Sequence, residues 1–327
     1  MESLEALYQS ALKPDLFKLE GQRKTAKKKL VITIVVIAVF NLGCLYLIAK
    51  MGLRLGFMWI PLFLSLLPML AWYAKYFKGY KDQFKASIIA KIVNAIDSAL
   101  TYDQNGMVPK AEFIASHLFA ESPDDYSGDD LISGMVGQTA IQCSEIWVNK
   151  VEIVRVSTGS TGSGSRRTRK KYHPVFNGLF FVADFNKSFN GITLVLPDKA
   201  QKLLGGLGQA LQKLNVQNGE LIKLEDPEFE KRFVVYGQDQ VEARYILSTS
   251  LMQRIVAFQK RAQKEIRLSF ANNKLYMAVA FDGELFEPSL MGSLLDFAQV
   301  QAYHDDLKLA TDIVTELNLN TRIWSRK

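Results

Sequence analysis

The sequence has few of the residues that build disulfides or metal sites. It contains 2 cysteines and 3 histidines in 327 residues. Cys44 lies in an apolar run and Cys143 about a hundred residues further on, so they form neither a disulfide framework nor a zinc site. His117, His173 and His304 also lack the spacing of metal ligands. We therefore predict no metal and no cofactor.

Motifs for nucleotide binding and for hydrolysis are missing as well. The glycine-rich stretch 159–164 does not end in Gly-Lys-Ser/Thr, and in the stretch with Gly205, Gly206 and Gly208, Leu211 stands where the last glycine of a dinucleotide fingerprint would fall. Ser160 and Ser163 do not form the strand-to-helix elbow of a hydrolase. The sequence thus contains no recognisable catalytic constellation.

Two long runs are free of charge, residues 30–49 and 55–74. Each has the length of a helix that crosses about 30 Å of hydrocarbon. Because only Lys50–Arg54 separates them, we predict a tight antiparallel transmembrane hairpin over residues 30–74. A buried hairpin in a soluble protein is disfavoured, and 29 residues before the first run disfavour a cleaved signal peptide.

Basic residues near the ends of the runs give the orientation. The turn has only Lys50 and Arg54, whereas both outer flanks are rich in lysine. These outer residues are Lys18, Arg23, Lys24, Lys27, Lys28, Lys29, Lys75, Lys78, Lys81, Lys85 and Lys91. We therefore expect both termini to be cytoplasmic.

The net charge of +7 belongs to the membrane region. Residues 1–85 hold 13 Lys and Arg against 5 Asp and Glu, a net of +8, and residues 86–327 hold 27 against 28, a net of −1. A nucleic-acid binder carries its positive charge on the folded domain. Nucleic acid is therefore an unlikely partner.

The rest of the chain divides into three further parts. Residues 1–29 are an amphipathic cytoplasmic segment with Pro14 predicted to interrupt its helix; the segment either lies on the membrane or docks on the main domain. Residues 75–130 form a helical stalk to about residue 101 and a connector with a helix at 109–119. We read acidic residues 124–130 as a solvated turn, because they lack the ligand pattern of a calcium loop.

Residues 131–327 alternate strand and helix signals without a strict βαβ repeat, which favours an α+β domain with a mainly antiparallel sheet covered by helices. Capping-box spacings pair Asp198 with Gln201, Asp239 with Glu242 and Ser250 with Gln253. The predicted helices are 199–214, 240–247, 251–264 and 298–318. The predicted strands are 138–156, 179–185, 192–196, 219–224, 232–237, 265–271 and 274–281.

One cluster of cations stands in a stretch without acids from Ile153 to Ala183. It follows the Ser/Gly tract 157–165, which predicts a long flexible hairpin loop. The composition favours a solubilising loop tip; the functional alternative is a contact with anionic lipid or with an acidic partner. Its members are Arg166, Arg167, Arg169, Lys170 and Lys171.

A second polar group lies at the predicted start of helix 240–247. Asp239 and Glu242 are explained by capping, and Arg244 is expected to pair either with neighbours of Glu242 or with Asp239. If the domain binds an anion, we expect the binding site at this helix start, where backbone N–H groups are free.

Two segments, Gly178–Phe189 and Glu225–Leu247, resemble a bacterial membrane family known as domain of unknown function, number 3137. Together with the transmembrane hairpin, the resemblance covers most of the chain. It implies a protein of the bacterial cytoplasmic (inner) membrane with a soluble C-terminal domain, and it brings no catalytic residue or cofactor. It also hints at a membrane-associated partner, such as a LemA-like protein.

We therefore predict a membrane-anchored, non-enzymatic interaction or sensing module at the cytoplasmic face, which recruits a protein partner or contacts anionic lipid. The alternative is a membrane-bound enzyme acting on a lipid or envelope precursor, built from dispersed residues. A transporter is disfavoured, since two uncharged spans provide no polar pathway.

Overall fold

A computed structural model describes residues 4–52, 59–158, 165–185, 188–198, 219–281 and 283–319. The chain forms two compact units. The first, here called the membrane-helix unit, comprises residues 1–95 and 286–304. The second, the sheet unit, comprises residues 96–285 and 305–327.

The membrane-helix unit begins with one continuous helix over Leu4–Lys50. It consists of α1 (Leu4–Leu7), the π-helical turn η1 (Tyr8–Leu12) and α2 (Lys13–Lys50). The predicted interruption at Pro14 was wrong. Pro14 occupies the first turn of α2, where its missing N–H removes little from the helix, and the wide π turn precedes it.

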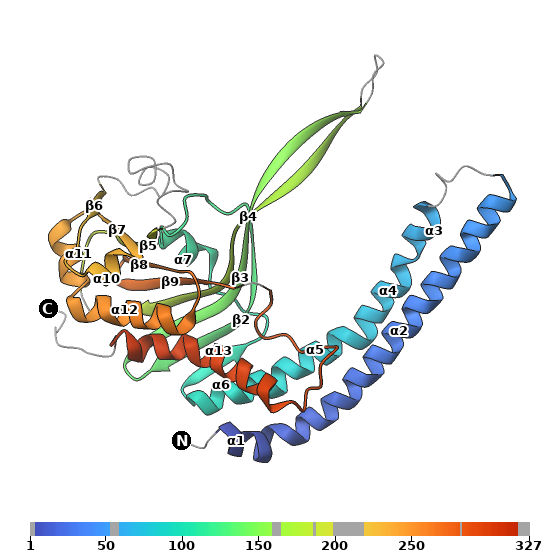
Figure 1. The fold of residues 1–327 in the computed structure, drawn as a ribbon, viewed down its shortest axis with the longest axis horizontal. Helices are drawn as coiled ribbons and strands as arrows, with labels where there is room; N and C mark the ends of the chain where they lie inside the picture. The colour runs from blue at the N-terminus through green and yellow to red at the C-terminus, as the bar shows by residue number, and fades with distance from the viewer. Residues whose placement is uncertain are drawn as a thin grey trace. The chain divides into compact units, whose positions relative to one another are not determined.

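The second helix runs over Trp59–Ile96. Its segments are α3 (Trp59–Leu64), α4 (Leu66–Trp72), η3 (Tyr73–Phe77), α5 (Lys78–Phe84), η4 (Lys85–Ile89) and α6 (Ala90–Ile96). It ends before the predicted residue 101, because the Asp97 side chain accepts the N–H of Ala99 and turns the chain. Figure 1 shows α2 running alongside α4 and α5.

Both helices are long and apolar enough to cross a membrane. Only 6% of the most apolar window of the first helix and 11% of that of the second are buried. Core helices of soluble proteins bury such windows, so this exposure fits contact with lipid. At one end of the apolar stretch, Trp72 Nε1 donates to the carbonyl of Ala26 at 2.9 Å and ties the two helices together.

The described part of the sheet unit holds a nine-stranded sheet of order β1-β2-β3-β4-β9-β8-β5-β7-β6. All of its strand pairs are antiparallel, which confirms the predicted α+β class. The strands are β1 (Leu100–Asp103), β2 (Asp125–Val136), β3 (Thr139–Thr158), β4 (Ser165–Asp184), β5 (Thr193–Pro197), β6 (Glu220–Ile222), β7 (Phe233–Gly237), β8 (Ile266–Ala271) and β9 (Lys274–Ala280).

Helices cover the sheet, as predicted. They are α7 (Lys110–Ala115), α10 (Pro227–Glu230), α11 (Gln240–Ile246), α12 (Thr249–Ala262) and residues 305–316 of α13 (Phe297–Glu316), whose first residues belong to the membrane-helix unit. Phe113 of α7 shares a core cluster with Phe180 and Tyr276 from the centre of the sheet. The next residues along these strands, Phe181 and Met277, point to the opposite face and are equally buried. Both faces of the central strands are therefore covered.

Three sequence predictions about this unit need correction. Residues 124–130 are not a solvated turn: most of them belong to β2, and Asp130 is buried. Helix α7 ends at Ala115, short of residue 119, because His117 has a positive φ of 53°. Helix α12 is capped by Ser248, two residues before the predicted Ser250. The predicted helix 199–214 and its Gln201 lie outside the described residues.

Candidate functional site

Strands β3 and β4 continue well past their neighbours in the sheet. The pairing of β2 with β3 ends at Asn149, and that of β9 with β4 ends at Gly178. Beyond these points residues 150–158 pair only with residues 165–173 of the described strands. We call residues 150–158 and 165–177 the β3–β4 arm. Figure 1 shows it as the green hairpin that projects from the sheet.

The predicted cation cluster lies on this arm. Expecting it on a flexible loop was wrong, because all five cations are in β4, paired with the β-branched run of β3. Only residues 159–164 of the predicted loop lie outside the described strands. The register places Arg166 opposite Ser157, Arg167 opposite Val156, Arg169 opposite Val154, Lys170 opposite Ile153 and Lys171 opposite Glu152. Arg169, Lys170 and Lys171 are exposed.

Alternation along the strands gives the arm two different faces. One face combines Ile153, 62% exposed, and Tyr172, 55% exposed, with Lys170. The other face carries Glu152, Arg169, Lys171 and His173, and His173 Nε2 lies 2.9 Å from Glu152 Oε2. Large exposed apolar side chains next to cations are typical of a surface that meets an interface, either of a protein or of a membrane.

The second predicted site, at the start of α11, is largely occupied by its own side chains. Asp239 accepts the N–H groups of Val241 and Glu242 at 2.7 and 3.1 Å, which confirms it as the helix cap. Glu242 does not complete the capping box. Its two carboxylate oxygens accept the backbone N–H groups of Asn190 and Gly191 at 2.9 and 2.8 Å.

Arg244 lies on the surface of the same helix. Its Nη2 donates to the carbonyl of Lys223 at 3.3 Å, and its Nη1 to Gln240 Oε1 at 3.4 Å. Neither Asp239 nor Glu242 is its partner in these contacts. The three side chains therefore hold α11 against neighbouring segments, and the N–H groups at the helix start are used by Asp239.

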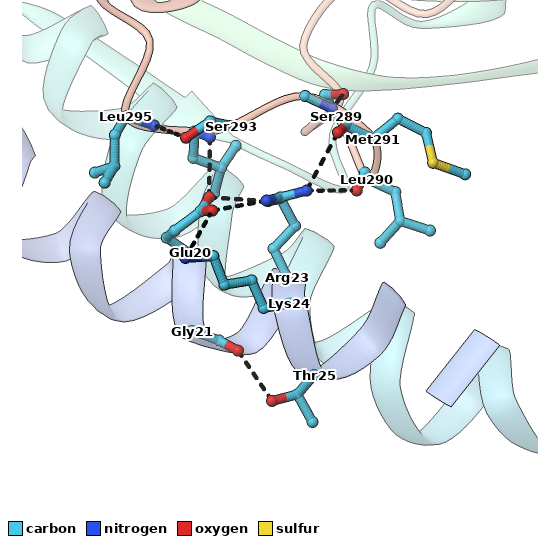
Figure 2. Close-up of polar contacts among 12 residues, drawn as sticks. Glu20, Gly21, Arg23, Lys24, Thr25, Ser289, Leu290, Met291, Ser293 and Leu295 are labelled. Carbon is cyan, nitrogen blue, oxygen red and sulfur yellow. Dashed lines mark hydrogen bonds and ion pairs between the residues drawn. The ribbon is translucent and has the colours of Figure 1, made fainter. Parts of the chain in front are cut away.

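A cluster that the sequence analysis missed lies in the membrane-helix unit, shown in Figure 2. Arg23 bonds both oxygens of Glu20, through Nε at 2.8 Å and Nη2 at 2.7 Å, and its Nη1 donates to the carbonyl of Leu290 at 2.8 Å. Glu20 in turn accepts the N–H of Leu294 at 3.1 Å. Hydrogen bonding to Arg23 lowers the pKa of Glu20, and the same bond raises the pKa of Arg23.

Further contacts fix the same segment, residues 286–295, to the two long helices. Glu287 Oε1 lies 2.5 Å from Lys81 Nζ and 2.9 Å from Lys85 Nζ, and Lys85 is 2% exposed. The Tyr80 hydroxyl donates to the carbonyl of Ser289 at 3.0 Å. We call the set Glu20, Arg23, Tyr80, Lys85 and Glu287 the juxtamembrane clasp. In the sequence, the cations of this set indicate only the orientation of the apolar runs. The i, i+3 spacing of Glu20 and Arg23 is the one local signal of the cluster, because it is typical of an ion pair on a helix.

Three carboxylates come together in the sheet unit. Ligand oxygens of Asp129, Asp130 and Glu145 all lie within 4.8 Å of one another. A bulge between Asp129 and Ile132 and a positive φ of 59° at Asp130 turn these side chains together. Carboxylate oxygens are ligands for hard cations. Within the structure they also serve as acceptors, since Tyr102 donates to Asp130 and the N–H of Leu285 to Glu145.

The fold thus defines an α+β protein with two helices long enough to cross a membrane. Residues 174–319, less than half of the chain, match the family model described as "Protein of unknown function (DUF3137)", which confirms the predicted resemblance over this part. A comparison with curated proteins found no match. A solved structure, the mycobacterial trehalose monomycolate transport factor A, TtfA, is similar at 10% identity and a TM-score of 0.31, over 70% of this chain and 95% of that chain. A TM-score this low does not establish a shared fold.

Proposed function

We propose that this protein is a non-enzymatic interaction module anchored in the bacterial cytoplasmic membrane, with both termini in the cytoplasm. Two exposed apolar helices supply the anchor. Basic residues are concentrated at the outer ends of the two apolar runs and are few in the turn between them. Its β3–β4 arm contacts the anionic lipid surface.

The observation that carries the lipid contact is the composition of the arm. Lys170 is exposed on the same face as Ile153 and Tyr172, and Arg169 and Lys171 are exposed on the opposite face of the same two strands. Cations attract anionic headgroups at about 1 kcal/mol each, and an aromatic ring with a polar tip favours the interface. Because the anchor keeps the arm near a bilayer at all times, even a weak contact is populated.

The contact is tested with the full chain in lipid nanodiscs. A Cys44→Ala background leaves Cys143, which is fully buried and whose thiol pKa is raised to about 12 by burial, so it resists labelling. An environment-sensitive dye on Tyr172→Cys reports the apolar face. The matched control places the dye on Glu152→Cys, which lies on the other face.

We expect the Tyr172→Cys signal to shift to the blue in nanodiscs with phosphatidylglycerol and not in pure phosphatidylcholine. Added salt and the triple variant R169Q/K170Q/K171Q should each remove the shift, and the Glu152→Cys probe should shift less. An unchanged signal in both lipids would overturn the lipid contact. A photocrosslinker at Tyr172 that captures a protein in intact membranes, such as a LemA-like partner, would then reassign the arm to protein recruitment.

Orientation has its own test. Fusions of a cytoplasm-active and a periplasm-active reporter at residue 52 and at the C-terminus should show the turn outside and the C-terminus inside. A periplasmic C-terminus contradicts the proposed cytoplasmic location.

A further inference from the structure

The membrane-helix unit contains a cleft of about 530 Å³ between α2 and the segments η3 and α5. It lies apart from the juxtamembrane clasp's ion pairs, although Tyr80 contributes to both. The side chains and glycines used in the argument come from both helices. They are Lys18, Gly21, Gln22, Lys75, Gly79 and Gln83.

Two glycines keep the cleft open. A Cβ atom built on Gly21 or on Gly79 would meet nothing within 4 Å, so each wall has unfilled space where another residue would place a side chain. Between the walls, Gln22 Nε2 donates to Gln83 Oε1 at 2.7 Å and forms a polar bridge. The cleft is therefore an open hollow crossed by a specific polar contact, and its size suits a small ligand group.

The charge in the cleft is positive. Lys18 and Lys75 stand on its two sides, and no Asp or Glu lines it among the residues the structure describes. The nearest acid along α2, Glu20, is bound to Arg23 and Leu294. Two ammonium groups and amide donors around an unfilled hollow are suited to a phosphate ester.

The cleft lies at the height of lipid headgroups. Lys75 directly follows the second apolar run, and Thr25, which also lines the cleft, precedes the first run by five residues, about 8 Å along a helix. The bond from Trp72 to Ala26 marks the boundary between the cleft and the apolar stretches. Beyond it, the helices present exposed apolar side chains such as Val31 and Leu70.

From these observations we infer that the cleft binds the phosphate headgroup of one anionic phospholipid, whose acyl chains lie along the exposed apolar sides of the helices. The site rests on the membrane anchoring proposed above and is independent of the β3–β4 arm. Acyl chains distinguish a lipid from a free phosphate, because only the lipid gains apolar contact next to the hollow.

Native mass spectrometry of the full chain in detergent tests the site, with phosphatidylglycerol, phosphatidylcholine and glycerol phosphate as probes. We expect one phosphatidylglycerol to bind at least about tenfold more tightly than phosphatidylcholine, and glycerol phosphate not to bind measurably. The double variant K18Q/K75Q should lose on the order of tenfold in phosphatidylglycerol affinity. Gly79→Leu, which fills the hollow without changing charge, should cause a similar loss.

Matched controls distinguish lipid binding in the cleft from a general attraction of anionic lipid to basic residues. K28Q/K29Q removes the same charge from exposed juxtamembrane positions outside the cleft, and Gly43→Leu repeats the glycine change at another open position of α2. Both should keep wild-type affinity. Equal binding of the two lipids, or equal losses in K28Q/K29Q and K18Q/K75Q, would overturn the site.

The arm variant R169Q/K170Q/K171Q belongs in the same titration. If it alone loses the bound lipid, the cleft site fails while the proposed role of the arm stands. If it binds like the wild type and the cleft variants do not, the site stands whatever the nanodisc experiment shows for the arm.

Discussion

Arg23 and Glu20 form a buried ion pair on α2 that also binds the backbone of a segment about 270 residues further along the chain. Three of the Arg23 nitrogens are in use, two toward Glu20 and one toward the carbonyl of Leu290. The pair therefore satisfies backbone groups of the segment 286–295 as well as its own charges. Its removal should affect the whole membrane-helix unit.

Replacing Arg23 by Met leaves the Glu20 carboxylate buried without its cation. Breaking a buried pair from one side costs about 3–5 kcal/mol, so we expect a loss of unfolding free energy of this order. Thermal unfolding of the full chain in detergent measures it. Lys24→Met is the control, because Lys24 is 71% exposed and lies 3.7 Å from Glu20; it should cost less than about 1 kcal/mol. Equal losses would contradict the role of Arg23.

The same ion pair makes the unfolding free energy of the protein depend on pH in the acid range. Since hydrogen bonding to Arg23 lowers the pKa of Glu20 below its ordinary 4.5, the stability that the carboxylate supplies is complete above pH 4.5 and is lost as the pH falls through the lower folded pKa. We expect Glu20→Gln to flatten this acid limb. Unfolding followed from pH 6 to pH 3 measures the slope in both proteins. An unchanged slope would show that other groups control acid unfolding.

Glu287 neutralises Lys85, which is nearly inaccessible to solvent. In Glu287→Gln the ammonium group stays buried beside a neutral amide, so we expect a loss of about 3 kcal/mol. Lys81→Gln, which removes the more exposed cation of the same cluster, should cost about 1 kcal/mol. Glu228→Gln removes an ion pair with Lys260 at the surface of the sheet unit and should cause no resolvable change. Chemical unfolding ranks the three variants.

Asp306 should make the sheet unit less stable at neutral pH. Burial raises its pKa to about 6, partly offset by Lys264 and reinforced by Asp305. An acid with a raised folded pKa favours folding when protonated, so its contribution becomes unfavourable as the pH rises from about 4 to about 6. Asp306→Asn should therefore gain up to about 2 kcal/mol at pH 7 and nothing near pH 4. Unfolding free energies of the variant and the wild type across this range decide it.

Glu242 should matter more than its neighbours at the start of α11. Its carboxylate accepts two backbone N–H groups, and hydrogen bonds to charged groups contribute about 1.5–3 kcal/mol. We expect Glu242→Ala to lose about 2–3 kcal/mol and to speed hydrogen exchange at Asn190 and Gly191. Arg244→Ala should lose less than about 0.5 kcal/mol, because its contacts are long and exposed. A larger effect at Arg244 would point to a binding role for that side chain.

Local pattern was enough to predict much of the fold. The β-branched runs near Val148 and Val195 predict strands because such residues suit a pleated, buried surface. Asp239 predicts a helix start because a short carboxylate fits the first N–H groups, and the structure has it there. The apolar runs predict helices from their length alone, and those helices are present.

Other features depend on contacts that no local window contains. The acidic start of β2 resembles a solvated turn, yet Asp130 is buried because Tyr102 and the bulge opposite Glu145 accommodate it. The cations of β4 resemble a loop, but the apolar run of β3 pairs with them residue by residue. The juxtamembrane clasp joins residues more than 200 positions apart, and only the folded chain brings them together.

The segment 286–304 belongs to the same compact unit as residues 1–95, and this sets an order for assembly during synthesis. The helices that bear Arg23 and Lys85 leave the ribosome about 200 residues before Glu287 and Leu290. At about 5–20 residues per second, that interval lasts roughly 10–40 s. Throughout it, the charged side chains of Arg23 and Lys85 lack the partners that bury them in the folded chain. The contacts that join the two long helices to the segment 286–295 therefore form only after residue 290 is made, and a chain truncated before residue 286 keeps both helices but lacks these contacts.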